Sequence, residues 1–159
     1  MEINIGQSQM KISDDPDDLI VTYSLGSCIG VSIYDENVKI GGLLHFQLPD
    51  SNESPTHHGK TRLSFADTAI PALLEEVCNR GAEKERLKVV IAGGSEIMFS
   101  GGSFDVGKRN IIAARKILFE NNIHAKYIDV GGNDYRTMRL YIRTGSTHII
   151  TPNCKTEVS

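Results

Sequence analysis

Three apolar runs rich in β-branched residues follow one another early in the chain, and they constrain the fold more than any other feature. They cover residues 19–23, 29–34 and 38–46. In the second run, Val31 and Ile33 alternate with Ser32 and Tyr34, and a period of two is typical of a strand on a pleated, half-buried surface. The interruptions between the runs are too short to hold a helix, so this part of the chain is predicted to form consecutive strands.

The rest of the chain supplies further strands and two amphipathic helices. Strands are expected at residues 3–5, 87–92, 123–130, 137–143 and 148–151, and helices at residues 66–77 and 107–121. The first helix follows Ser64 to Asp67, which resembles a capping box, and it contains Pro71, which is expected to kink it or to delay its start. Because the strands cluster at both ends, we predict a single α+β domain over residues 1–159, with two helices packed on mixed sheets. A doubly wound parallel sheet is the alternative.

Size and charge exclude several classes of function. The chain has 159 residues, 40% of them hydrophobic, and a net charge of -3, which gives no electrostatic reason to expect nucleic acid. No apolar run approaches the roughly 20 residues of a membrane span, and residues 1–5 lack the basic start of a signal peptide. We therefore expect a cytoplasmic protein. Its three cysteines form no CxxC pair, so disulfides are not expected.

Cys28 is the first candidate for chemistry, because it ends a turn of small residues between two predicted strands. Gly26 can adopt backbone angles closed to other residues, and Ser27 is too small to block an approach to the sulfur. We therefore predict an accessible thiol and a nucleophile. The alternative is a buried structural cysteine, since free cysteine is among the most buried residue types.

His45 is the candidate base for this thiol. It lies at the end of the third run, next to Phe46, and if residues 29–34 and 38–45 pair as a hairpin, Cys28 and His45 lie at the same end of it. Thr22, on the strand that leads to the turn, could orient the imidazole. A pair of this kind is expected to have a thiol pKa below the ordinary value near 8.5. The alternatives are a histidine with an ordinary strand-end hydrogen bond and a generic strand threonine.

A metal site is a weaker possibility. Cys28, His45, His57 and His58 are residue types that suit zinc. Structural zinc sites bring their ligands in closely spaced pairs, and the adjacent pair His57 and His58 is awkward to place on one ion. We therefore predict no metal.

Six ordered blocks give the chain a family resemblance from about residue 19 to residue 145. With these blocks the chain resembles the CheD family of chemoreceptor glutamine deamidases. The blocks are residues 21–28 (VTYSLGSC), 42–51 (GLLHFQLPDS), 65–69 (FADTA), 92–99 (AGGS and MF), 107–110 (GKRN) and 129–133 (DVGGN).

The resemblance implies a cysteine amidohydrolase without a cofactor that converts receptor glutamines to glutamates. It implies a fold similar to the cytotoxic-necrotising-factor deamidase domain, with Cys28 as nucleophile, His45 as general base and Thr22 supporting His45. The expected partners are the helical cytoplasmic domain of a chemoreceptor and a regulatory CheC-type phosphatase. We place the oxyanion near the turn at Gly26 and Ser27. The alternatives are a non-catalytic adaptor that binds such a phosphatase or a receptor, and a hydrolase of small amides.

Overall fold

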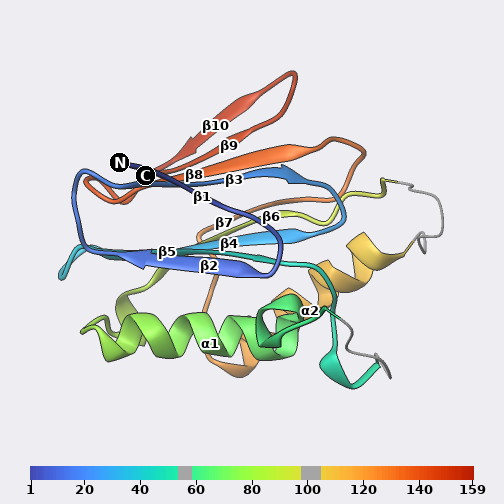
Figure 1. The fold of residues 1–159 in the computed structure, drawn as a ribbon, viewed down its shortest axis with the longest axis horizontal. Helices are drawn as coiled ribbons and strands as arrows, with labels where there is room; N and C mark the ends of the chain where they lie inside the picture. Colours follow the sequence, from blue (N-terminus) through green and yellow to red (C-terminus); the bar gives the residue numbers. More distant parts are fainter. Residues whose placement is uncertain (54–58, 98–104) are drawn as a thin grey trace.

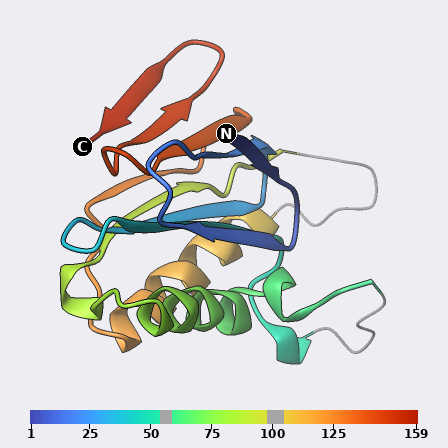
Figure 2. The same ribbon diagram turned by 60° about the vertical axis from the view of Figure 1, so that its left-hand side comes forward.

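The computed structural model describes residues 1–53, 59–97 and 105–159, and its elements form three layers: a sheet, a second sheet and a pair of helices (Figure 1). The first sheet has the order β1-β3-β8-β9-β10, with bounds Glu2–Ile5, Leu19–Leu25, Arg136–Tyr141, Thr147–Ile150 and Lys155–Val158. The second sheet has the order β2-β5-β4-β6-β7, with bounds Gln9–Ser13, Ile40–Phe46, Ile29–Asp35, Lys88–Gly93 and Tyr127–Val130. Helices α1 (Ala66–Asn79) and α2 (Val106–Glu120) lie side by side beneath the second sheet (Figure 2).

The central strands β4 and β5 of the second sheet are buried on both faces because this sheet is the middle layer. Along β4, Ile29, Val31 and Ile33 belong to the core shared with the helices. The intervening residues face the first sheet, where Ser32 Oγ lies 2.7 Å from Thr147 Oγ1 of β9. A strand buried on both faces reads as an almost continuous apolar run, which is what the sequence has here.

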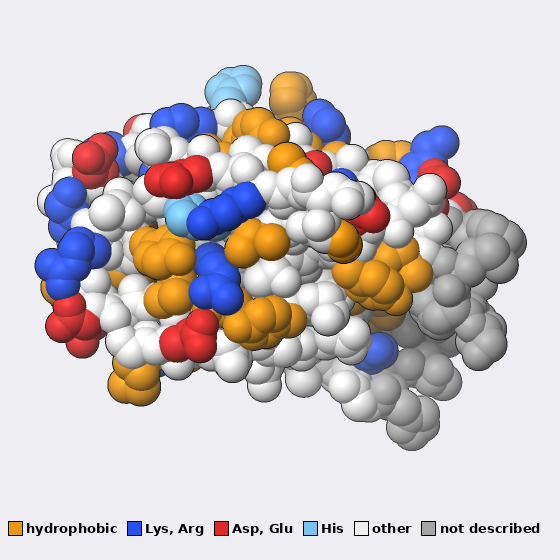
Figure 3. Space-filling view, turned by 90° about the horizontal axis from the view of Figure 1, so that it is seen from above, with side chains coloured by type: hydrophobic (Ala, Val, Ile, Leu, Met, Phe, Trp, Pro, Cys, Tyr) orange, Lys and Arg blue, Asp and Glu red, His pale blue; other side chains and the backbone are white. Residues whose placement is uncertain are grey.

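The outer face of the first sheet meets solvent. Figure 3 looks onto this face and shows charged side chains of both signs between hydrophobic ones. Between strands of this sheet, Arg139 forms an ion pair with Glu2 at 3.6 Å, and His148 Nε2 lies 3.6 Å from the carboxylate of Glu157. Within the described residues, no helix is long and apolar enough to cross a membrane.

The α+β class and both helices are confirmed, and the doubly wound alternative is wrong because β4 pairs antiparallel with both of its neighbours. The strand expected over 123–130 is shorter, beginning at Tyr127. Strands β2 and β10 were not predicted. Both are short edge strands, and β10 has little apolar content of its own.

Two local predictions about the first helix need correction. Helix α1 begins at Ala66 and continues through Pro71, so the proline does not delay its start. The predicted capping box from Ser64 to Asp67 is wrong, because Phe65 is the N-cap and makes no side-chain cap. A capping box does form one turn earlier, between Thr61 and Ser64. The Asp67 carboxylate instead accepts hydrogen bonds from the N–H and the hydroxyl of Ser51.

Candidate active site

The turn that carries Cys28 crosses from one sheet to the other. Strand β3 ends at Leu25 in the first sheet, and β4 begins at Ile29 in the second. Each backbone carbonyl of the turn is held from outside it. Gly26 O accepts from the N–H of Ser95 at 2.9 Å, and Cys28 O accepts from the N–H of Gly94 at 2.9 Å. The third carbonyl, that of Ser27, accepts from the side-chain amide of Asn110 at 2.8 Å.

Cys28 and His45 lie on the same face of the second sheet. The predicted hairpin is confirmed: β4 pairs antiparallel with β5, and Gly30 is directly opposite His45. Cys28 lies two residues before Gly30 and immediately before β4, so the alternation of the strand places it on the face that His45 occupies. This face looks toward the first sheet, where Cys28 belongs to the inter-sheet core. The topology therefore brings the two predicted residues to one end of the layer between the sheets.

Thr22 contacts His45 from the opposite sheet and fixes its tautomer. Thr22 Oγ1 donates to the carbonyl oxygen of Ile5 at 3.0 Å and lies 2.8 Å from His45 Nδ1. A hydroxyl has a single proton, and here it is committed to Ile5, so Thr22 must accept from Nδ1–H. The other ring nitrogen, Nε2, is then the one with the lone pair. A β-bulge follows in β3, between Thr22 and Leu25.

The imidazole of His45 is kept neutral. Its side chain is buried, and this burial lowers the pKa of His45 to about 4. Its Nε2 is buried and has no hydrogen-bond partner among the described residues. Cys28 and His45 are therefore not hydrogen-bonded to each other in this state, and Nε2 is an unused acceptor.

Cys28 differs from its prediction in two respects. The residue is only 9% exposed, so the prediction of an accessible thiol is wrong for this state. Burial raises the pKa of the Cys28 thiol to about 11, and the positive charge of Lys60 offsets only part of this rise. The expected low pKa is therefore also wrong. Lys60 is held nearby through Gln47, whose side-chain oxygen accepts from Nζ at 2.8 Å.

Thiol alkylation should reflect this burial. At neutral pH, iodoacetamide should label Cys78 and Cys154, which are both exposed, before it labels Cys28. With a pKa near 11, only about one Cys28 thiol in ten thousand is ionised at pH 7, and the thiolate is the reactive form. Peptide mass spectrometry over a time course measures the order. In urea all three thiols should react alike, and preferential labelling of native Cys28 would contradict the buried, neutral state.

The loop of residues 93–95 supports the turn, and it is anchored by Arg136, a residue to which the sequence analysis assigns no role. This guanidinium is buried and donates to Gly93 O at 3.3 Å and to Ser95 Oγ at 2.8 Å. It also pairs with Asp129 at 3.2 Å. Gly93 has a φ of +116°, and a Cβ there would lie 2.2 Å from Cys28 O. The glycines of the Gly93-Gly94-Ser95 block are thus the feature of the sequence that indicates the close approach of another segment, here the Cys28 turn.

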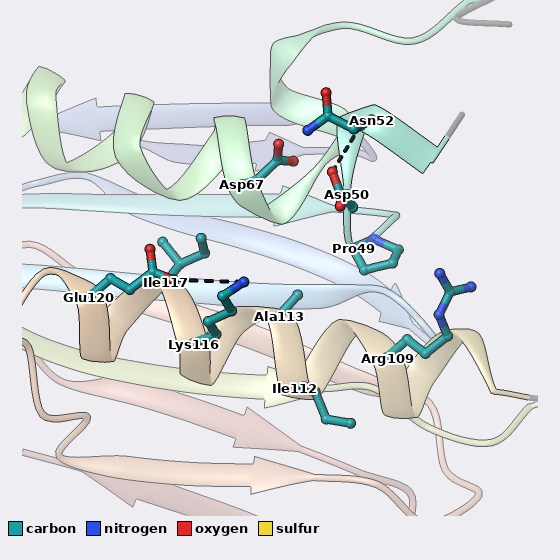
Figure 4. Close-up of a pocket in the computed structure, with 10 residues that line it drawn as sticks. All are labelled: Pro49, Asp50, Asn52, Asp67, Arg109, Ile112, Ala113, Lys116, Ile117 and Glu120. Atoms are coloured by element: carbon teal, nitrogen blue, oxygen red, sulfur yellow. Dashed lines mark hydrogen bonds and ion pairs between the residues drawn. The ribbon is translucent and has the colours of Figure 1, made fainter. Parts of the chain in front are cut away.

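A separate depression of about 530 Å³ lies between α2 and the loop after β5 (Figure 4). Its lining includes apolar side chains at Pro49, Ala113 and Ile117 and charged ones at Asp50 and Lys116. Cys28, His45 and Thr22 do not line it. This hollow is therefore distinct from the cysteine site.

The zinc alternative is not supported by a cluster in the part of the chain that the structure describes. Three or more metal-ligating side chains do not come together there. His57 and His58 lie outside the described residues, so this alternative is not tested by them.

Comparisons with known proteins agree with the resemblance. A family model described as CheD chemotactic sensory transduction matches residues 47–151. The chain is 45% identical to a probable chemoreceptor glutamine deamidase CheD of Solibacter usitatus, over 91% of this chain and 85% of the relative. It is 41% identical to a probable chemoreceptor glutamine deamidase CheD 1 of Syntrophus aciditrophicus, over 93% and 92%.

Among solved structures, the Bacillus licheniformis hypothetical protein YfiH matches with a TM-score of 0.47 and 12% identity, over 78% of this chain and 49% of that one. This likeness is too low to carry a conclusion about the chain. The family model and the sequence relatives suffice: the matches extend over both sheets and both helices, and the chain belongs to the CheD family.

Proposed function

We propose that this protein is a chemoreceptor glutamine deamidase, a cysteine amidohydrolase that converts receptor glutamines to glutamates in the cytoplasm. One observation carries the proposal most: Thr22 fixes the tautomer of a neutral, buried histidine, so that its free nitrogen is the acceptor beside a cysteine on the same face. The names of the relatives, probable chemoreceptor glutamine deamidases, indicate the substrate class.

In the acylation step, Nε2 of His45 takes the proton of the Cys28 thiol while the sulfur attacks the carboxamide carbon of a glutamine side chain. The imidazolium then gives this proton to the leaving nitrogen, and ammonia departs. A thioester remains on Cys28. The step requires Sγ and Nε2 to come within hydrogen-bond reach when substrate binds, as catalytic contacts often do only in the complex.

In the deacylation step, water attacks the thioester carbonyl, and His45 Nε2 takes the proton of that water. The carbon–sulfur bond breaks, the sulfur regains its proton from the imidazolium, and glutamate is released. The balance is one water consumed and one ammonia formed for each glutamine. The chemistry uses no metal or organic cofactor.

The oxyanion of each tetrahedral intermediate is proposed to bind the backbone N–H groups of Ser27 and Cys28. In a trans peptide, the C=O and the N–H point in opposite directions. The carbonyls of Gly26 and Ser27 are both held by partners outside the turn, so the N–H groups of the next residues point away from those partners. Gly26 thus contributes its anchored carbonyl, and the donors are the following two amides.

The test is peptide mapping of a purified receptor cytoplasmic fragment after incubation with the protein. Deamidation replaces –NH₂ by –OH at individual glutamines, and the mass increase locates each site. We expect conversion at a few glutamines of the receptor and none of free glutamine or small amides. Hydrolysis of small amides with an unmodified receptor would favour the small-amide hydrolase, and no hydrolysis of either would favour the adaptor.

A substitution of Thr22 tests the role assigned to its hydroxyl. Thr22→Val should lower kcat by about tenfold to a hundredfold, by analogy with the loss of the group that orients a metal-bound histidine. The variant leaves Nδ1–H of His45 and the carbonyl of Ile5 without their partner. Thr22→Ser keeps the hydroxyl and should stay close to wild type in rate. Equal rates for the valine and serine variants would contradict this role.

The adaptor alternative has one observation in its favour, which is the buried, neutral state of Cys28. A protein that only binds would have no need for an exposed thiolate.

We retain as part of the proposal that the protein binds a CheC-type phosphatase, as the family resemblance implies. Co-purification of such a phosphatase with the wild-type protein and with a Cys28→Ala variant separates binding from catalysis. Loss of the sulfur should abolish deamidation and leave phosphatase binding unchanged.

A further inference from the structure

Asn110 lies on α2, yet its side chain joins the two halves of the site. Its Nδ2 donates to Ser27 O at 2.8 Å and to Gln47 O at 2.9 Å. Ser27 precedes the nucleophile, and Gln47 follows the base His45 by two residues. We propose that Asn110 is a positioning residue for the oxyanion donor, the N–H of Cys28. This inference rests on the proposed deamidase function.

The orientation of the Asn110 amide follows from its surroundings. Two carbonyl oxygens lie within hydrogen-bond distance of the same atom, and only the NH₂ group of an amide can donate to both of them. The residue is completely buried, so solvent does not compete for these bonds. Its Oδ1 is buried without a partner among the described residues. The Asn110 side chain thus uses both N–H donors of its amide, and its oxygen acceptor is left without a partner among the described residues.

The first of these bonds determines where the Cys28 N–H points. Ser27 C=O and Cys28 N–H belong to one planar peptide unit, so holding the oxygen fixes the direction of the hydrogen. The neighbouring peptide units are held by Ser95 and Gly94 through backbone N–H groups, which are present whatever the side chain. Only the central peptide unit is held by a side chain. The direction of the Cys28 N–H can therefore be changed by substituting one residue, Asn110.

The second bond explains why a side chain from α2 holds the turn. The carbonyl of Gln47 belongs to the segment that leaves β5 immediately after His45, so one amide holds both this segment and the Cys28 turn. A misdirected N–H would affect the charged transition state and leave ground-state binding unchanged, since the oxyanion exists only after attack.

The experiment compares kcat and KM of four proteins on a receptor cytoplasmic fragment. Asn110→Asp is isosteric but cannot donate when ionised, and it places an oxygen against two carbonyls. It should lower kcat by about 10²-fold to 10³-fold, the scale for loss of one oxyanion donor, with KM unchanged. Asn110→Ala should lower kcat less, because water can occupy the vacated space and donate. If Asn110 only fills space, the order is reversed.

Asn121→Ala is the matched control. Asn121 is the C-cap of the same helix, at the end away from Asn110. Its Nδ2 donates to Ile117 O at 2.8 Å, so the variant also loses an amide hydrogen bond. Its kcat should equal that of wild type. Should Asn110→Asp fail to fold, the comparison of Asn110→Ala with Asn121→Ala still decides the question.

Alkylation of Cys28 by iodoacetamide gives a second readout that needs no receptor. This displacement forms no oxyanion, so in the Asn110 variants its rate should fall much less than that of deamidation, even though the Cys28 N–H also lowers the pKa of its own thiol. A parallel fall of alkylation and deamidation would overturn the proposal, because Asn110 would then act on the sulfur or on the fold. Wild-type kcat in both Asn110 variants would also overturn it. An inactive wild-type protein, or an active Cys28→Ala variant, would instead refute the deamidase function.

Discussion

The Cys28→Ala variant should have no detectable deamidase activity and should still fold. The mechanism has no route to ammonia release without the sulfur, since water would have to attack an unactivated amide. The sulfur is packed between the sheets, so its removal leaves a small cavity. We expect a loss of about 1 kcal/mol in the free energy of unfolding, as for a deleted methylene group, and a melting temperature lower by roughly 2–4 °C.

The other two cysteines provide matched controls. Cys78 and Cys154 are exposed, and replacing either with alanine should change neither the rate nor the melting temperature. Receptor peptide mapping and thermal unfolding on the same preparations measure both quantities. A Cys28→Ala protein that is unfolded at assay temperature, or one that still deamidates, would return Cys28 to the role of a structural thiol.

The His45→Ala variant should lose about 10²-fold to 10⁴-fold in kcat, the range for a positioned general base. The raised pKa of Cys28, about 11, is the reason to expect a large value. At pH 7 such a thiol supplies about one part in ten thousand of thiolate, so attack depends on a base that removes the proton during the step. The exposed His124 is the control residue, and His124→Ala should retain full activity.

The pH profile of kcat/KM for the wild-type enzyme should report the pKa of His45. Burial lowers the pKa of His45 to about 4. The imidazole accepts a proton only when it is neutral, so kcat/KM should be flat near neutral pH and should fall by half only near pH 4. An ordinary histidine would give this midpoint near 6.5. A midpoint near 6.5, or near-wild-type activity of His45→Ala, would assign the base to another residue.

Much of the site follows from short-range features of the sequence. Two β-branched runs with a three-residue polar interruption predict a hairpin, and a hairpin places Cys28 and His45 at one end without knowledge of anything else in the fold. The same reasoning holds for the helices, whose apolar residues recur at helical spacing. These predictions succeed because they depend on residues that are close in sequence.

The state of Cys28 could not be predicted in this way. Its burial depends on β3 and β4 entering different sheets and on the loop of residues 93–95, which Arg136 anchors from more than 40 residues further along the chain. The pattern of either strand contains no signal for which sheet it joins. Asn110 entered the sequence analysis only as part of the 107–110 block. Its position on a predicted helix does not indicate which backbone carbonyls its side chain contacts.

The position of Thr22 and His45 in different sheets has a consequence for how this active site tolerates change. The 2.8 Å distance between Oγ1 and Nδ1 spans the gap between the two sheets, and the width of that gap is determined by the volumes of the side chains that fill it, such as Leu43 and Met138. Protein interiors are packed too densely to absorb a change in volume without movement of their surroundings. The alignment of Thr22 with His45 therefore depends on the hydrophobic packing between the sheets. Substitutions in those core residues must keep their summed volume nearly constant, even where no residue of the site is altered.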